Sequence, residues 1–170
     1  MAFQVRRGSI VWLLVLASAC ATPASPTEVG TDADAGATAS SDVATSLVQL
    51  TNSERSTAGL AAMRANTRLM QAAQLHADQM ARMDKLAHEL SGAQYPRPQD
   101  RLAAAGYLWQ AYAENIAMGQ STAAAAMDGW MHSSGHRANI LNPSLAEIGI
   151  GFAHNSAGRP YYVQVFGTPR

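Results

Sequence analysis

The segment WMHSSGHRANILNPSLAEIGIG, from Trp130 to Gly151, decides the fold of this chain. It finishes one helical pattern, turns at Ser134 and Gly135, and then leads into a strand in which glycines alternate with bulky residues. His136 stands at that turn. The sequence therefore predicts that His136 belongs to whatever site this protein has.

The strand that follows this turn has two different faces. In Glu147 to His154, the residues Ile148, Ile150 and Phe152 alternate with Gly149, Gly151 and Ala153. Alternation of this kind places bulky side chains on one face of a strand and lets another backbone approach the other face closely. After a short loop that contains glycine, Pro160 to Phe166 is predicted to return as the second strand of a hairpin.

Upstream of the segment, apolar residues recur at spacings of three and four, which is typical of helices packed on one side. Capping residues and glycines mark their ends. Together with the hairpin, these elements predict an α+β fold in which an antiparallel sheet is covered on both faces by helices. The helices are expected from Ser41 or Asp42 to Gly59, from Asn66 or Thr67 to Met83, from Gln99 to Ala105, and from Ser121 or Thr122 to Met131, with a first strand at Tyr112 to Met118.

Residues 1–19 have the features of an export signal. Arg6 and Arg7 precede a short apolar run, and Cys20, the only cysteine of the chain, follows small residues. The apolar run is too short to span a bilayer. A lone cysteine at this place predicts cleavage before Cys20 and its lipidation, so that the protein is a membrane-anchored lipoprotein. Ordinary secretion, with cleavage near Ala19 or Ala21, is the alternative.

Residues 20–42 are expected to be a disordered tether. After Cys20 the segment consists almost wholly of Ala, Thr, Ser, Pro, Gly and Asp, so it cannot bury enough apolar surface to offset the entropy of ordering. Residues 43–170 are then one domain. Without Arg6 and Arg7 the chain has ten basic and twelve acidic residues, and this balance gives no indication of a nucleic-acid partner.

Three polar residues outside the opening segment are candidates for a site. His88 follows the end of a helical stripe, so its side chain is expected to point either into a cleft or into water. Glu114 lies in the strand YAENIAM, where it is either a solvent-facing residue of an edge strand or a buried carboxylate that needs a cation, a metal or several donors. His76 lies on an apolar helical face, where a packing role is the usual one.

Several segments of the chain resemble the signature segments of the CAP superfamily, the group of cysteine-rich secretory proteins, antigen 5 and pathogenesis-related class 1 proteins. The resemblance extends over essentially the whole domain and is greatest to the bacterial branch, whose members also lack disulfides. The segments that carry it are AENIAMG at Ala113 to Gly119, WMHSSGHRANILNP at Trp130 to Pro143, EIGIGF at Glu147 to Phe152, YYVQVFG at Tyr161 to Gly167, and the helical stretch from Leu50 to Ala81.

The resemblance implies a three-layer α-β-α sandwich with a small antiparallel sheet and a shallow cavity. In family members two histidines and two acidic residues line this cavity, and by position they correspond here to His88, Glu114, His136 and, for the second acidic residue, Ser133. The chain therefore departs from the pattern at Ser133. The sequence leaves open whether Glu147 supplies a carboxylate to the cavity instead.

Two interpretations of these residues follow. Two imidazoles and a carboxylate with an open position match a zinc site, or a site for another divalent metal, with His88 and His136 as ligands. Alternatively, the same residues form a hydrogen-bonded network that rigidifies the cavity. A Ser–His–Glu triad is disfavoured because the chain has no GxSxG motif.

The first hypothesis for function is a non-enzymatic binding module, exported and anchored at Cys20, with a shallow His/Glu cavity for a small-molecule, lipid or cell-wall ligand. The alternative is a metal-assisted hydrolase acting on peptides or cell-wall material. Both place the protein in the periplasm or at the cell surface. The sequence gives no indication of the oligomeric state.

Overall fold

The computed structural model of the chain describes the backbone of residues 32–170 and the side chains from Ser40 onward. The signal segment, Cys20 and tether residues 20–31 lie outside the described residues. Within the described part, no helix is both long enough and apolar enough to cross a membrane.

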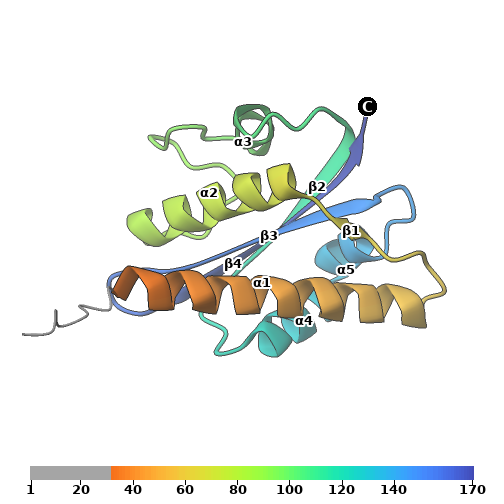
Figure 1. Cartoon of the computed structure of the whole chain (residues 1–170), viewed down its shortest axis with the longest axis horizontal. Coiled ribbons are helices and arrows are strands. Elements are labelled where there is room, and N and C mark those ends of the chain that lie inside the picture. Colours follow the sequence, from red (N-terminus) through yellow and green to blue (C-terminus); the bar gives the residue numbers. More distant parts are fainter. Residues whose placement is uncertain (1–31) are drawn as a thin grey trace, which may run out of the picture. The chain divides into compact units, whose positions relative to one another are not determined.

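The described region consists of helices interleaved with short strands (Figure 1). In chain order these are α1 (Asp32–Thr57), β1 (Arg64–Ala65), α2 (Thr67–Met83), α3 (Pro98–Ala104), β2 (Trp109–Met118), α4 (Ala123–Met131), α5 (Ser134–Ile140), β3 (Glu147–His154) and β4 (Pro160–Pro169).

The elements form three layers, as expected. Figure 1 shows α2 and α3 on one side of the sheet and α1, α4 and α5 on the other. Strand β4 shows how the core divides, because Val163 and Val165 pack with the α2 and α3 side chains, whereas Tyr162 and Phe166 pack with those of α1, α4 and α5. Alternation along one strand thus supplies both cores. The prediction of an α+β sandwich is confirmed.

The sheet is mixed, which corrects the prediction of an antiparallel sheet. The strand order is β1-β3-β4-β2, and β3 and β2 both pair antiparallel to β4. The additional strand β1 pairs parallel to β3, with Arg64 opposite Glu147. A strand of two residues carries no sequence pattern, so this pairing was not predicted. Strand β2 also begins three residues before Tyr112, at Trp109.

Two glycines of β3 allow helix α2 to lie directly on the sheet. A Cβ atom at Gly149 would stand 2.1 Å from the carbonyl carbon of Leu69, and one at Gly151 would stand 2.2 Å from the carbonyl oxygen of Ala73. Both positions are therefore closed to any side chain. The expected close approach of backbone to this face of β3 is confirmed, and the element that approaches is α2.

Helix α2 begins and ends where the sequence predicts. The side chain of Asn66 accepts hydrogen bonds from the backbone N–H groups of Arg68 and Leu69, at 2.9 and 3.3 Å. At the other end Asp84 adopts a left-handed conformation with φ of 47°, which ends the helix. The Asn66 cap thus fixes where α2 begins, and α2 is the helix that carries His76.

Helix α1 begins earlier than predicted. The expected cap was Ser41 or Asp42, but the helix extends back to Asp32, so residues 32–42 are helical and not part of a disordered tether. Alanines at alternate positions in DADAGATA explain the extension, because alanine has the highest helix propensity. Compositional simplicity was thus a poor guide to disorder here.

The opening segment also folds differently from the prediction at one point. Ser134 and Gly135 do not form a turn but the first residues of helix α5, and His136 lies within that helix. Ser133 is the residue that precedes the helix, with φ of −100° and ψ of 119°. The turn between α4 and α5 is thus earlier in the chain than expected.

The outer edge of β3 beyond β1 is covered by side chains of α2. The Gln74 carboxamide donates from Nε2 to the carbonyl of Phe152 at 2.9 Å and accepts from the Phe152 N–H at 3.2 Å. Next to it, the Ile150 N–H donates to the sulfur of Met70 at 3.0 Å. Gln74 therefore pairs with Phe152 through the same two groups that a neighbouring strand would use.

Candidate functional site

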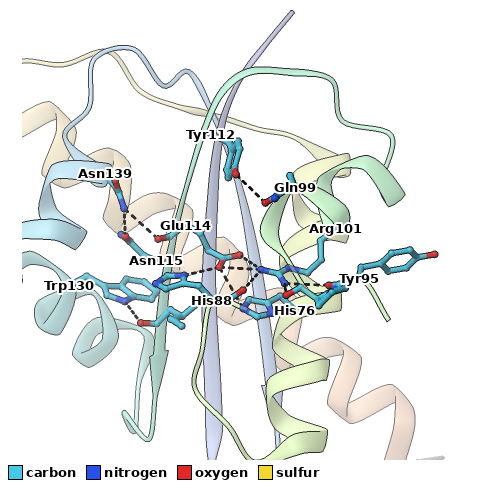
Figure 2. A network of polar contacts seen from close by, with 12 residues as sticks. His76, His88, Tyr95, Gln99, Arg101, Tyr112, Glu114, Asn115, Trp130 and Asn139 are labelled. Carbon is cyan, nitrogen blue, oxygen red and sulfur yellow. Dashed lines mark hydrogen bonds and ion pairs between the residues drawn. The ribbon is translucent and has the colours of Figure 1, made fainter. Parts of the chain in front are cut away.

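The carboxylate of Glu114 is the centre of a buried polar cluster (Figure 2). Strand β2 places it beneath α2 and α3, where only 4% of its side chain is exposed. Its Oε1 accepts a hydrogen bond of 2.9 Å from Nδ1 of His88, and Nη2 of Arg101 lies 3.2 Å from Oε1 and 3.0 Å from Oε2. Of the two alternatives for Glu114, the structure therefore bears out the buried carboxylate with a cation and several donors.

Arg101 is the cation of this cluster, and the sequence did not indicate it. Its side chain is 1% exposed, and both terminal guanidinium nitrogens reach backbone carbonyls of the loop between α2 and α3. The distances are 3.0 Å to His88, 3.1 Å to Pro96 and 3.5 Å to Tyr95. One guanidinium thus joins the loop that carries His88 to the carboxylate that orients the His88 ring.

His88 lies at the surface end of the cluster. Its side chain is 50% exposed, and it comes from the loop after α2, as the sequence predicts. Burial raises the pKa of the Glu114 carboxyl, but the hydrogen bond from His88 and the charges of His76 and Arg101 bring that pKa below its ordinary value. Glu114 is therefore ionised at neutral pH and accepts its hydrogen bond from an N–H at Nδ1 of His88.

His76 lies at the inner end of the cluster, buried among the apolar side chains of α2 as a packing role predicts. It is fully buried on α2, and its Nε2 lies 3.5 Å from Oε1 of Glu114 (Figure 2). The carboxylate therefore stands between a buried imidazole and a half-exposed one. A polar residue in the middle of an apolar stripe was the one sequence signal for His76, but nothing in the sequence showed its partner.

Burial makes stability depend on pH through His76. Desolvation lowers its pKa from 6.5 to about 4, although the charge of Glu114 acts in the opposite direction. Between these two pH values the unfolded chain binds a proton that the folded chain does not, so the free energy of unfolding falls as the pH is lowered. The expected loss is about 3 kcal/mol over the whole window.

Urea unfolding at pH 7 and at pH 4.5 measures this loss. His76→Gln removes the titrating group, so its free energy of unfolding is expected to change less between the two pH values than that of the wild type. Slope that remains in the variant comes from His136, whose pKa is lowered by desolvation and by the charge of His88, and from the carboxyls of Glu114 and Glu147, whose pKa values are also lowered. An equal slope in both proteins would contradict the assignment to His76.

His136 and Ser133 line a pocket next to the cluster. The pocket has a volume of about 220 Å³ and lies against Ile116 to Met118 of β2, between α4, α5 and Leu86 of the loop after α2. Nδ1 of His136 is buried and has no hydrogen-bond partner among the described residues. The structure thus brings His88 and Glu114 into contact and places His136 and Ser133 in the wall of a pocket that neither of the first two residues lines.

A chain of amides fixes helix α5, and with it His136, to the sheet. Asn115 donates to the backbone carbonyl of His136 at 3.1 Å and to the side chain of Gln164 at 3.0 Å. Asn139 donates to Asn115 at 2.9 Å, and Gln164 donates to Thr51 at 2.9 Å. Glu114 and its neighbour Asn115 thus face opposite sides of the sheet. Glu114 binds the ring of His88 on one side, and Asn115 binds the backbone of His136 on the other.

Glu147 belongs to a separate cluster. Its Oε2 accepts hydrogen bonds of 2.9 Å from Asn66 and from Tyr107, and Arg64 pairs with its Oε1. This cluster ties the end of β3 to β1 and to the cap of α2. The sequence left open whether Glu147 supplies a carboxylate to the cavity. In the structure Glu147 pairs with these residues and not with His88 or His136.

The donor set at Glu114 does not fit a metal ligand. Arg101 and His88 already occupy both carboxylate oxygens, and an arginine supplies the positive charge that a metal would bring. In the part of the chain that the structure describes, no group of three or more His, Cys, Asp or Glu side chains is arranged to hold a metal ion. The contacts of Glu114 are thus those of a hydrogen-bonded network, and a divalent metal held by His88 and His136 stays a prediction.

The three-layer fold and the His–Glu pair at the edge strand define an SCP-like domain. In agreement, the model of the CAP family, described as the cysteine-rich secretory protein family, matches residues 48–166. The chain belongs to the CAP family.

Relatives with this domain occur in Bacillus subtilis (strain 168). The uncharacterized protein YkwD of this organism is 34% identical over 111 residues, which are 65% of this chain and 42% of YkwD. The uncharacterized membrane protein YlbC of the same organism is 31% identical over 120 residues, 71% of this chain and 33% of YlbC. The chain thus spans less than half the length of the curated relatives it matches.

Solved structures agree with the fold. The structure of an extracellular protein containing a SCP domain from Bacillus anthracis str. Ames superposes with a TM-score of 0.72 at 26% identity, covering 86% of this chain and 45% of that one. An outer surface protein from Borrelia burgdorferi superposes with a TM-score of 0.66 at 18% identity, covering 73% of this chain and 90% of that one. At that identity the second likeness concerns the fold alone.

Proposed function

We propose that this protein is an exported, non-enzymatic binding module that takes a small or lipidic ligand in the pocket beside His136. The observation that carries the proposal is the ion pair of Glu114 with the buried Arg101, together with its hydrogen bond from His88. A general base needs a free lone pair and a pKa near the working pH. Glu114 does not meet the second condition, because the hydrogen bond from His88 and the charges of His76 and Arg101 hold its pKa below the ordinary value.

The pocket supports binding rather than chemistry for a second reason. Ser133 precedes helix α5, and Nδ1 of His136 has no hydrogen-bond partner among the described residues, so the serine hydroxyl does not engage it. Apolar residues and glycine share the pocket wall with the polar side chains of Gln120, Ser133 and His136, so the wall offers both kinds of contact to a ligand. These features favour recognition of a ligand over attack by a nucleophile.

Export and anchoring are part of the proposal. Residues 1–19 have the composition of a signal segment, and Cys20 stands where a lipid anchor would be attached. The similar protein from Bacillus anthracis is described as extracellular. The domain would then act outside the cytoplasm, held to a membrane through Cys20.

Zinc titration and hydrolysis assays separate this proposal from the metal-assisted hydrolase. We expect peptides and peptidoglycan fragments to remain intact in the presence of the full chain, with or without zinc, when followed by mass spectrometry. Calorimetric zinc titration is expected to give the same weak binding for the wild type and for His136→Ala. Stoichiometric zinc binding that His136→Ala abolishes, together with cleavage that Glu114→Gln abolishes, would overturn the proposal.

A further inference from the structure

Apolar and basic side chains lie together on the surface where helix α2 ends. Every residue from Arg82 to Leu86 is exposed, and we call this run the α2-end surface. Met83 and Leu86 are large apolar residues with exposed fractions of 42% and 41%. Lys85, the only lysine of the chain, lies between them in the sequence. Removing apolar surface from water is favourable, so this surface gains from a partner that covers it.

The basic side chains of the α2-end surface have no acidic partner. Within the described part of the chain, neither Arg82 nor Lys85 forms an ion pair. The acidic residue of the run is already engaged, because the Asp84 carboxylate pairs with Arg159 at 3.1 Å and accepts a hydrogen bond of 2.6 Å from Tyr161. The surface thus offers positive charge beside apolar groups, a combination that suits an anionic and partly apolar partner.

Helix α1 begins at the same end of the domain. Figure 1 shows the start of α1, the end of α2 and the hairpin between β3 and β4 together, on the left. The contacts agree, because Ser40 in the first part of α1 donates to the carbonyl of Phe152 near the hairpin at 3.4 Å. From the hairpin itself, Asn155 donates to the carboxylate of Asp84 at 2.7 Å. The described chain therefore begins at the end that carries the α2-end surface.

The length of the preceding segment keeps this end near the anchor proposed at Cys20. Cys20 and Asp32 are 12 residues apart, a separation that spans at most about 40 Å. Helix α1 has 26 residues and is therefore roughly 39 Å long. Turning the opposite end of α1 to the membrane would require the segment to be almost fully extended. The α2-end surface reaches the membrane without that extension.

From these observations we infer that the α2-end surface contacts an anionic lipid bilayer, the one to which Cys20 anchors the chain. Met83 and Leu86 lie among the lipid headgroups, and the cations of Arg82 and Lys85 pair with anionic ones. The inference rests on the anchoring that is part of the proposed function, and it names the face that the anchor brings to the bilayer. Basic residues close to an anionic membrane each strengthen binding by about fivefold, so two of them add substantially to an anchor.

Coupling the full chain to a membrane at one point tests this contact. Cys20 is the only cysteine, so a maleimide lipid in a nanodisc attaches the chain at that residue alone. The nanodisc contains phosphatidylcholine, phosphatidylglycerol and a doxyl-labelled lipid, whose spin label broadens NMR signals of groups close to the bilayer. The methyl signals of Met83 and Leu86 are expected to broaden. Leu108 is the matched control, because it is 68% exposed but precedes β2 at the end of the sheet away from the hairpin, so its signals should stay sharp.

Variants of single basic residues test the role of charge. Lys85→Gln removes one cation of the α2-end surface, so the ratio of docked to undocked domain, measured from the broadening at Met83, is expected to fall roughly fivefold. Arg68→Gln is the control, because Arg68 is an exposed basic residue at the other end of α2. It should leave the ratio unchanged. An equal fall in both variants, or none in Lys85→Gln, would contradict the pairing with anionic lipid.

Three further results would overturn the inference. They are equal broadening at Leu108 and Met83, broadening that is undiminished in nanodiscs of phosphatidylcholine alone, and changes at Met83 that grow with protein concentration without lipid. The last would show a second copy of the chain on this surface. Because the coupling supplies the tether, these results do not depend on lipidation. An exported protein whose mass shows no lipid at Cys20 would count against the proposed anchoring, whatever the nanodiscs show.

Discussion

Gly149→Ala is expected to prevent stable folding of the domain. The added methyl group would stand 2.1 Å from the carbonyl carbon of Leu69 and 2.3 Å from its oxygen, both of which are backbone atoms within helix α2. Neither can move without shifting the whole helix away from the sheet, and overpacking against a rigid backbone costs at least about 3 kcal/mol. Circular dichroism and urea unfolding of the purified variant measure the loss.

The same substitution at Gly135 provides the control. Its Cβ position meets nothing within 4 Å, and it lies in helix α5, so Gly135→Ala is expected to leave stability unchanged or to raise it by roughly 0.5–1 kcal/mol. A Gly149→Ala protein that unfolds at the same urea concentration as the wild type would show that α2 does not pack on β3 as described.

Arg101→Leu is expected to be the most damaging change within the candidate site. It leaves the carboxylate of Glu114 buried without its permanent cation and removes the donor to the carbonyls of His88 and Pro96. Breaking a buried ion pair by removing one partner costs about 3–5 kcal/mol. The free energy of unfolding from urea titration should fall by that amount.

The double variant Arg101→Leu with Glu114→Leu separates charge from packing. If the cost of Arg101→Leu comes from the unpaired carboxylate, removing that carboxylate as well restores part of the stability, whereas a pure packing defect would become larger. A further readout is the NMR signal of the His88 ring. It should change in the double variant, because the hydrogen bond from Nδ1 to Glu114 is lost there. Loss of less than about 1 kcal/mol in the single variant would contradict the role given to Arg101.

The parts of the fold that the sequence predicts are those with a strong local pattern. Helix α2 has an apolar stripe and an asparagine cap, and both of its ends were predicted within a residue. Strand β3 has strict alternation of large and small residues, and its bounds were predicted as observed. In both elements the local signal and the packing in the fold agree, so one could be inferred from the other.

Other elements depend on contacts that no local pattern records. Strand β1 is defined by its pairing with β3, and the early start of α1 lies in a stretch that composition marks as disordered. Helix α5 is too short for its periodicity to be distinguished from a turn. These elements became visible only in the folded chain.

The candidate site shows the same division. His88 and Glu114 were candidates from their positions in the chain and gained weight from the resemblance, and the structure brings them into contact. Arg101 was missed, although a buried carboxylate requires a cation, because the sequence offers many basic residues and no means of choosing among them. The pairing of Glu114 with Arg101, a residue of α3, and with His76, a residue of α2, is a property of the fold.

The pairing of Gln74 with the edge of β3 has a consequence for how the protein behaves at high concentration. A strand edge with free N–H and C=O groups is a template on which a second chain can add, and uncovered edges are a common starting point for aggregation. Here the carboxamide of Gln74 occupies the groups of Phe152, and Met70 occupies the N–H of Ile150. Two side chains of one helix thus cover these backbone groups, so this part of the edge does not present them as a template for a further strand.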